Sequence, residues 1–294
     1  MSNGNTIPDV SVIIPAWNAS ETILDAIDSA LQQTGCLVEI IVVDDESSDN
    51  TPEILAGLGD RIRWKRFPNG GPGKSRNRAA ALARGKWLAF LDSDDLWEPS
   101  KLASQLKAAS DNNATVVYTN ARNFGDDLPV DEIRLTDSQC HSGDVFTELL
   151  LDNFVTISGL MVRRDVYEQV GGFAEDLVGT EDWDLMLRLA TTETFAVVRE
   201  PVTLYRWANT SLSSKYDVML KARRETIKRA LTSPRGQQLS SRFKRRVWAN
   251  LWSTAAWFAE GGSKKRAISW YLRSLGWQPL QPGVCKGIVR TLIR

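Results

Sequence analysis

The chain has 294 residues, no net formal charge, three cysteines and 43% hydrophobic residues, which is typical of a soluble globular protein with one large domain or two smaller ones. No apolar run approaches the roughly 18 residues of a membrane-spanning helix, and Met1–Asp9 shows neither the basic nor the apolar region of a secretory signal. With a single histidine and three widely spaced cysteines, we expect a reducing, cytoplasmic location without zinc or disulfides.

The first half of the chain alternates strand and helix patterns. β-branched and apolar runs predict strands at Val10–Ile14, Val38–Val43, Arg61–Arg66 and Trp87–Leu91. Apolar residues at helical spacing predict helices at Ser20–Gln33, from Thr51 as a cap with Pro52 in the first turn, at Lys74–Arg84 and at Pro99–Ala109. This alternation predicts an α/β fold, with a mostly parallel sheet that helices cover on both faces.

The second half is predicted to end in helices. Further strands are expected at Thr115–Thr119, Gly159–Val162, Phe195–Val198 and Val202–Arg206. Two helices are expected between them: a short one with Asp165 and Glu168 as a capping pair, and one at Glu181–Ala190. Three more helices are expected at about Tyr216–Leu231, Leu239–Glu260 and Lys264–Leu275. We therefore divide the chain into an α/β domain, residues 1–214, and a helical C-terminal region, residues 215–294.

Polar clusters follow three of the predicted parallel strands: Pro15-Ala16-Trp17-Asn18, Asp44-Asp45 and Asp92-Ser93-Asp94-Asp95. The carboxyl ends of such strands share one edge of the sheet, where ligands bind. Three carboxylates after a buried strand repel one another, and a hard cation such as Mg²⁺ or Mn²⁺, with open positions for substrate phosphates, would relieve that repulsion. A solvated acidic turn is the alternative for the acidic segment alone, and its position beside the other clusters favours the cation.

The ordered motifs resemble those of the family 2 glycosyltransferases with the GT-A fold, over about residues 8–210. They are Val12-Ile13-Ile14-Pro15-Ala16-Trp17-Asn18, Ile41-Val42-Val43-Asp44-Asp45, Ser75-Arg76-Asn77, Phe90-Leu91-Asp92-Ser93-Asp94-Asp95 and Gly179-Thr180-Glu181-Asp182-Trp183-Asp184-Leu185. The resemblance implies a Rossmann-like catalytic domain and an inverting transferase. It also implies a nucleotide-diphosphate sugar as donor, usually of uridine, and Mg²⁺ or Mn²⁺ as cofactor.

The resemblance also assigns roles to individual residues. Eight would bind the nucleotide sugar: Pro15, Ala16, Asn18, Asp44, Asp45, Arg76, Asp92 and Ser93. Among these, Asp44 and Asp45 would accept hydrogen bonds from the base, and Asp92 would face the ribose or the donor sugar. Asp94 would be the main metal ligand, and Asp182 would be the catalytic base.

The chain departs from the family pattern at two positions. Glu46 follows the paired acids where the family often has glycine, and Trp207 stands where many members have a polar residue or histidine near the diphosphate. We therefore expect the contacts to the diphosphate to differ in part.

The chemistry implied is direct displacement at a sugar carbon. A cation on Asp94 would neutralise charge on the departing diphosphate, and ionised Asp182 would take the proton of the attacking hydroxyl. The acceptor would be a glycan or lipid-linked glycan, in the synthesis of a cell-surface polysaccharide or glycolipid. Two alternatives remain: a sugar nucleotidyltransferase, although its glycine-rich first loop is missing, and a non-catalytic nucleotide-sugar-binding protein, which leaves Asp182 without a task.

The C-terminal region is strongly basic. Residues 215–294 carry 18 lysines and arginines against 3 acidic residues, whereas residues 1–214 carry 18 against 33. The region also has five tryptophans: Trp248, Trp252, Trp257, Trp270 and Trp277. Its helices could pack on the acidic domain, or they could hold the protein peripherally on an anionic membrane surface, because basic residues with interfacial tryptophans favour such attachment. No nucleic-acid-binding module is recognisable, and we expect no nucleic-acid partner.

Overall fold

The computed structural model describes residues 7–125, 132–207 and 216–293. Within these residues, eight strands form one sheet in the order β3-β2-β1-β4-β7-β6-β8-β5. The strands are β1 (Val10–Ala16), β2 (Val38–Asp44), β3 (Arg63–Arg66), β4 (Trp87–Phe90), β5 (Leu96–Trp97), β6 (Val116–Phe124), β7 (Met161–Arg163) and β8 (Phe195–Arg206). Strands β1 to β4 are parallel neighbours, as are β6 and β8, whereas β7 and β5 run antiparallel to their neighbours. The predicted α/β fold with a mostly parallel sheet is confirmed.

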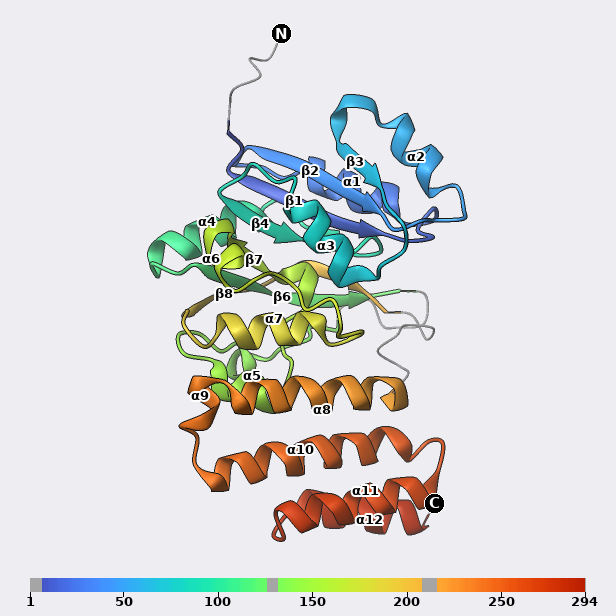
Figure 1. Cartoon of the computed structure of the whole chain (residues 1–294), viewed down its shortest axis with the longest axis vertical. Coiled ribbons are helices and arrows are strands. Elements are labelled where there is room, and N and C mark those ends of the chain that lie inside the picture. The colour runs from blue at the N-terminus through green and yellow to red at the C-terminus, as the bar shows by residue number, and fades with distance from the viewer. Residues whose placement is uncertain (1–6, 126–131, 208–215, 294) are drawn as a thin grey trace.

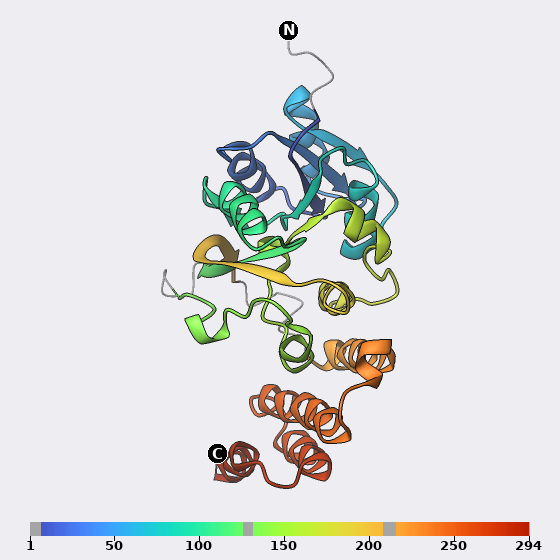
Figure 2. The ribbon, with the colours of Figure 1, turned by 90° about the vertical axis from the view of Figure 1, so that its left-hand side faces the viewer.

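Helices cover both faces of this sheet (Figures 1 and 2). They are α1 (Ile23–Leu31), α2 (Thr51–Gly57), α3 (Pro72–Ala80), α4 (Lys101–Asp111), α5 (Phe146–Leu151), α6 (Arg164–Gln169) and α7 (Glu181–Leu189). Successive side chains of a strand point to opposite faces. Val12 and Ile14 of β1 therefore pack in the core shared with α1 and α4, while Ile13 packs in the core shared with α3 and α7. Two apolar layers thus hold β1 in the centre of the fold.

The C-terminal region is helical, as predicted, and is stacked against the α/β domain. It contains α8 (Tyr216–Thr232), α9 (Pro234–Gln237), α10 (Ser241–Ala259), α11 (Lys264–Trp277) and α12 (Pro282–Ile293). Helix α8 lies against α7, α10 lies against α8, and α11 and α12 form the outermost layer (Figure 1). Ile227 and Leu251 share the core of the α/β domain, and Arg229 and Arg235 form ion pairs with Asp176 and Asp144. These contacts favour the interpretation that α8 and α10 pack on the α/β domain. The proposed boundary at 214/215 lies at the edge of residues that the structure does not describe.

Several local predictions need correction. Asn50, not Thr51, caps α2, and Thr51 is the first helical residue, with its hydroxyl bonded to Asp49. Asp165 pairs with Arg163 instead of forming a capping box with Glu168. The two expected late strands form the single strand β8, which pairs with β6 on both sides of a register shift between Thr119 and Ala121. Helices α5, α9 and α12 and the short strand β5 were not predicted.

Among the described residues, no helix is both long enough and apolar enough to cross a membrane.

Candidate active site

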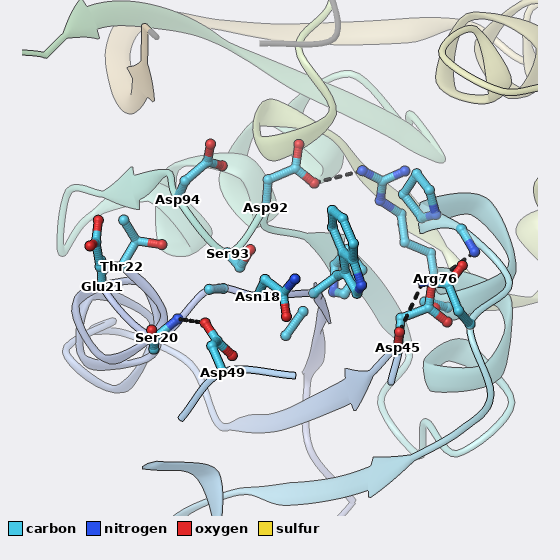
Figure 3. A pocket seen from close by; sticks show the side chains of 18 of the residues that line it. Asn18, Ser20, Glu21, Thr22, Asp45, Asp49, Arg76, Asp92, Ser93 and Asp94 are labelled. Atoms are coloured by element: carbon cyan, nitrogen blue, oxygen red, sulfur yellow. Dashed lines mark hydrogen bonds and ion pairs between the residues drawn. The ribbon is translucent and has the colours of Figure 1, made fainter. Parts of the chain in front are cut away.

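A cavity of about 940 Å³ opens at the carboxyl ends of β1, β2 and β4 (Figure 3). Three parallel neighbours end there, so residues far apart in sequence meet at one edge. Eight of the predicted site residues line the cavity: Pro15, Ala16, Asn18, Asp45, Arg76, Asp92, Ser93 and Asp94. Asp44 and Asp182 do not line it. The structure therefore brings together most of the residues that the motifs indicate, and it separates two of them.

Asp45 fixes one wall of the cavity. Its carboxylate accepts hydrogen bonds from the backbone amides of Gly70 and Gly71, at 3.0 and 2.8 Å, and pairs with the Arg78 guanidinium at 3.3 Å. Gly71 adopts a φ of 83°, a conformation that favours glycine. Asp45 thus holds the segment before α3 in place, and any contact with a nucleotide base would be additional to this task.

Asp44 faces away from the cavity. Adjacent residues at the end of a strand point to opposite sides, so Asp44 is fully buried while Asp45 reaches the cavity. The Asp44 carboxylate lies 3.3 Å from Arg66 Nε and accepts a hydrogen bond from the Ser47 amide. Asp44 therefore holds the loop after β2, and its contact with the base stays a prediction.

Asn18 and Asp49 tie the loops after β1 and β2 together. The Asn18 side-chain oxygen accepts a hydrogen bond from the Ser48 amide at 2.8 Å, and Asn18 has a φ of 48°. Asp49 accepts hydrogen bonds from the Ser20 amide and the Thr51 hydroxyl. Slight burial opposes ionisation of Asp49, but these hydrogen bonds outweigh it and lower the pKa of Asp49 to about 2. The floor of the cavity is therefore a preformed, hydrogen-bonded loop pair.

The acidic segment after β4 presents its carboxylates unequally. Oxygens of Asp92, Asp94 and Asp95 all lie within 4.8 Å of one another. Asp95 is buried and accepts hydrogen bonds from the Ser158 hydroxyl, at 2.5 Å, and from the Arg206 amide, at 2.8 Å. The side chains of Asp92 and Asp94 face the open side of the cavity (Figure 3). Asp95 thus anchors the turn, and Asp92 and Asp94 are the carboxylates available to a ligand.

The charges in this segment fit a divalent cation. Desolvation in the cleft and then the charge of Asp92 raise the pKa of Asp94 to about 6. Burial, followed by the charges of Asp92 and Asp94, raises the pKa of Asp95 well above its ordinary value. Such shifts show that the three negative charges are unfavourable together without a counter-charge. A hard cation with oxygen ligands would supply that charge, with Asp94 and Asp92 as the residues that would hold it.

Arg76 connects the acidic segment to the start of α7. Its guanidinium lies 2.6 Å from Asp92 and 3.1 Å from Glu181, and its side chain is only 5% exposed. Burial disfavours the charged guanidinium, but the carboxylates of Asp92 and Glu181 outweigh this effect and raise the pKa of Arg76. The Arg76 guanidinium also lies over the Phe173 ring, at 5.3 Å. Glu181, to which the sequence assigned no role of its own, is therefore a partner of a site residue.

Asp182 lies beside this ion pair, in the first turn of α7. Its carboxylate accepts hydrogen bonds from the Trp183 amide at 2.7 Å and from the Asn153 amide group at 3.3 Å. Burial and then the charge of Glu181 raise the pKa of Asp182 to about 6. A carboxylate with this pKa is ionised near neutral pH and still basic enough to take a proton. Asp182 is therefore chemically suited to its predicted role, although it lies outside the cavity lining.

Eleven of the nineteen lining residues were not predicted as site residues, and Arg206 and Trp17 are two of them. Arg206 ends β8, and its Nε donates a hydrogen bond to the Asp94 carbonyl at 2.8 Å. Trp17 exposes 60% of its surface at the mouth of the cavity. Trp17 follows β1 and Arg206 ends β8, so their positions at strand ends could have indicated them as site residues. The side-chain directions that bring Arg206 to β4 depend on the pairing of β8 with β6, which the sequence does not reveal.

Comparisons with known proteins agree with this site. Residues 11–171 match the family described as "Glycosyl transferase family 2". The chain is 42% identical over 116 residues to the succinoglycan biosynthesis protein ExoO of Rhizobium meliloti. The match covers 39% of this chain and 33% of that protein. It is 31% identical over 198 residues to the hyaluronan synthase of Pasteurella multocida, covering 66% of this chain and 20% of that protein. The matches thus span about a third or less of these two relatives.

Solved structures show the same fold. S. aureus TarS 1–349 in complex with UDP-GlcNAc superposes with a TM-score of 0.67 at 18% identity, over 96% of this chain and 89% of that one. The mannosyltransferase PcManGT from Pyrobaculum calidifontis, in complex with GDP-Man and Mn²⁺, superposes with a TM-score of 0.59 at 15% identity, over 98% of this chain and 87% of that one. At such identities the likeness concerns the fold alone. Because the family match covers more than half of the chain, the chain belongs to glycosyl transferase family 2.

Proposed function

We propose that the chain transfers a sugar from a nucleotide-diphosphate donor to a hydroxyl acceptor with inversion, and that transfer depends on Mg²⁺ or Mn²⁺. The observation that carries the proposal is the acidic group Asp92-Asp94-Asp95 in a preformed cleft at the strand ends. Polysaccharide-synthesis relatives and the UDP-GlcNAc complex of a structural neighbour support a sugar nucleotide, and we propose a uridine one. The GDP-Man complex of another neighbour makes guanosine the alternative to test.

The residues divide the work between donor and acceptor. A cation on Asp94 and Asp92 would act as a Lewis acid on the leaving diphosphate. The guanidinium of Arg206, at the same edge, would add positive charge beside the diphosphate. Asp182 would accept the proton of the attacking hydroxyl, and Asn153, which donates to the Asp182 carboxylate, would hold it in place.

The acceptor that we propose is a glycan or lipid-linked glycan, as expected for polysaccharide or glycolipid synthesis. A cytoplasmic location, peripheral attachment to an anionic membrane and the absence of a nucleic-acid partner stay predictions. The sugar nucleotidyltransferase and the non-catalytic binding protein are the competing functions. A sugar nucleotidyltransferase would release diphosphate from a nucleoside triphosphate. A non-catalytic protein would bind the donor without consuming it.

The test is a panel of UDP- and GDP-sugars, with and without Mn²⁺, read by thermal stabilisation and by release of nucleoside diphosphate. We expect one donor to stabilise the protein in a metal-dependent manner and to be hydrolysed slowly. Asp94→Ala should lose the metal-dependent stabilisation, whereas Asp182→Asn should keep donor binding and lose turnover. Asp60→Asn, in an exposed turn, is the matched control. Normal turnover in folded Asp94→Ala and Asp182→Asn proteins would refute the proposal.

A further inference from the structure

A second cavity lies on the C-terminal helices, outside the strand-end cleft. It measures about 590 Å³ and is lined by residues of α8, α10 and α11. The lining residues are Arg224, Trp248, Trp252, Arg273, Gly276 and Trp277, which we call the Trp–Arg pocket. Three of these six residues are tryptophans and two are arginines. That composition is found at recognition sites more than on ordinary protein surface.

The tryptophans form a flat apolar wall. Trp248 and Trp277 stack with ring centres 5.9 Å apart and planes 27° apart. Trp277 is 41% exposed, whereas Trp252 is 7% exposed and forms the deeper part. A Cβ atom placed on Gly276 would meet no atom within 4 Å, so the space beside the wall is open. The pocket therefore offers exposed aromatic surface, chiefly that of Trp277, to a ligand.

The arginines place positive charge next to this wall. The guanidinium carbons of Arg224 and Arg273 lie 5.7 and 4.9 Å from the centre of the Trp252 ring. Both arginines are exposed, and within the described residues neither pairs with a carboxylate. Two like charges on one ring repel each other, and a carboxylate or phosphate would satisfy both, since guanidinium groups bind such anions with paired hydrogen bonds.

We infer that the Trp–Arg pocket binds a sugar ring that carries a carboxylate or phosphate, as part of an anionic glycan. The apolar C–H face of a pyranose ring can pack on an indole face, and its acidic substituent can reach the arginines. A concave pocket with few polar groups fits one ring, whereas a membrane surface would be met by a convex face. The inference concerns a site away from the donor cleft, and it stands even if the proposed transferase reaction is wrong.

Binding is measured on the full chain by tryptophan fluorescence and calorimetry, without donor or metal. The probes are an oligosaccharide of alternating glucuronate and N-acetylglucosamine, the same oligosaccharide with its carboxyl groups reduced, and a mannose oligosaccharide that carries 6-phosphate. We expect saturable binding of at least one acidic probe, about tenfold or more tighter than that of the reduced one. The two acidic probes distinguish a carboxylate ligand from a phosphate ligand.

Variants separate the pocket from general basicity. Arg224→Gln/Arg273→Gln keeps the aliphatic stems on Trp252 and should weaken binding about tenfold or more. Trp277→Leu should also weaken it. Lys264→Ala/Lys265→Ala removes the same charge from exposed positions of α11 and should leave binding unchanged. Asp94→Ala should bind the glycan normally, because the donor cleft is not involved.

Three results would overturn the inference. The first is failure of all acidic probes to bind. The second is equal weakening by the arginine pair and the lysine pair, which would mean unspecific attraction. The third is binding of phosphatidylglycerol vesicles, lost in the arginine variant, without any glycan binding, which would assign the surface to a membrane instead. Circular dichroism on each variant shows whether the fold is kept.

Discussion

The buried Arg76 ion pair offers the sharpest test of how the site is held together. Arg76→Met keeps the length of the side chain and removes its charge. Glu181, whose side chain is 7% exposed, then stays as a buried carboxylate without its cation, while Asp92, at 27%, can turn to water. Removing one partner of a buried pair costs about 3–5 kcal/mol, and we expect Arg76→Met to fall in that range.

The assay is equilibrium unfolding in urea, combined with a double-mutant cycle. Glu181→Gln alone removes one of the two carboxylates that pair with the Arg76 guanidinium. In the double variant Arg76→Met/Glu181→Gln, neither buried charge of this pair is left without its partner. The double variant should therefore be more stable than the sum of the single losses predicts, by about 1–3 kcal/mol. Arg61→Met is the control, because Arg61 and Asp28 form an exposed pair worth about 0–1 kcal/mol. Strict additivity, or a loss no larger than in the control, would refute the ion-pair reasoning.

Three further predictions concern the acids and their support. Because the pKa of Asp182 is raised to about 6 and a base must be ionised, kcat/KM should fall about tenfold per pH unit below that value; a flat profile down to pH 5 would exclude Asp182 as the base. Protons compete with the cation for Asp94, whose pKa is also about 6, so Mn²⁺ affinity, measured by calorimetry, should be steady above pH 7 and weaken below pH 6. Ser158→Ala removes the hydroxyl that joins the Asp92 amide to the buried Asp95 carboxylate. We expect this variant to lower the free energy of unfolding by about 1–3 kcal/mol and to weaken Mn²⁺ binding. The control Ser138→Ala, at an exposed position, should change neither quantity.

The placement of the cleft could be predicted from the sequence because it depends on strand order alone. Val10–Ile14, Val38–Val43 and Trp87–Leu91 are apolar runs separated by helices, which predicts parallel neighbours, and parallel neighbours end at the same edge. Polar residues directly after such strands must then meet. This reasoning needs no knowledge of side-chain directions, and eight of the predicted residues do line the cavity.

The roles of individual residues were harder to predict where they depend on the direction of a side chain or on a partner far away in the sequence. Asp44 and Asp45 are equivalent in a motif and both are buried, but their side chains point to opposite sides and only Asp45 lines the cavity. Arg206 reaches the cleft through the pairing of β8 with β6, and Glu181 gains its role from Arg76, which lies 105 residues earlier. Helix α5 has only six residues, which is too short for a helical period to stand out, whereas the apolar periodicity of α12 is clear and was overlooked.

Arg76 lies near two acids of similar pKa for which we propose different tasks. Asp94 and Asp182 both have a pKa raised to about 6 by desolvation and a neighbouring carboxylate. Asp94 stands in the open cleft, where a cation can reach it, whereas Asp182 lies outside the cavity lining, and the guanidinium of Arg76 lowers the pKa of both. The same guanidinium holds Asp92, so a cation bound at the acidic segment would share Asp92 with Arg76. If the proposed roles hold, donor loading and the basicity of Asp182 would be linked through the buried side chain of Arg76, and the proposed base would feel the charge of the donor site.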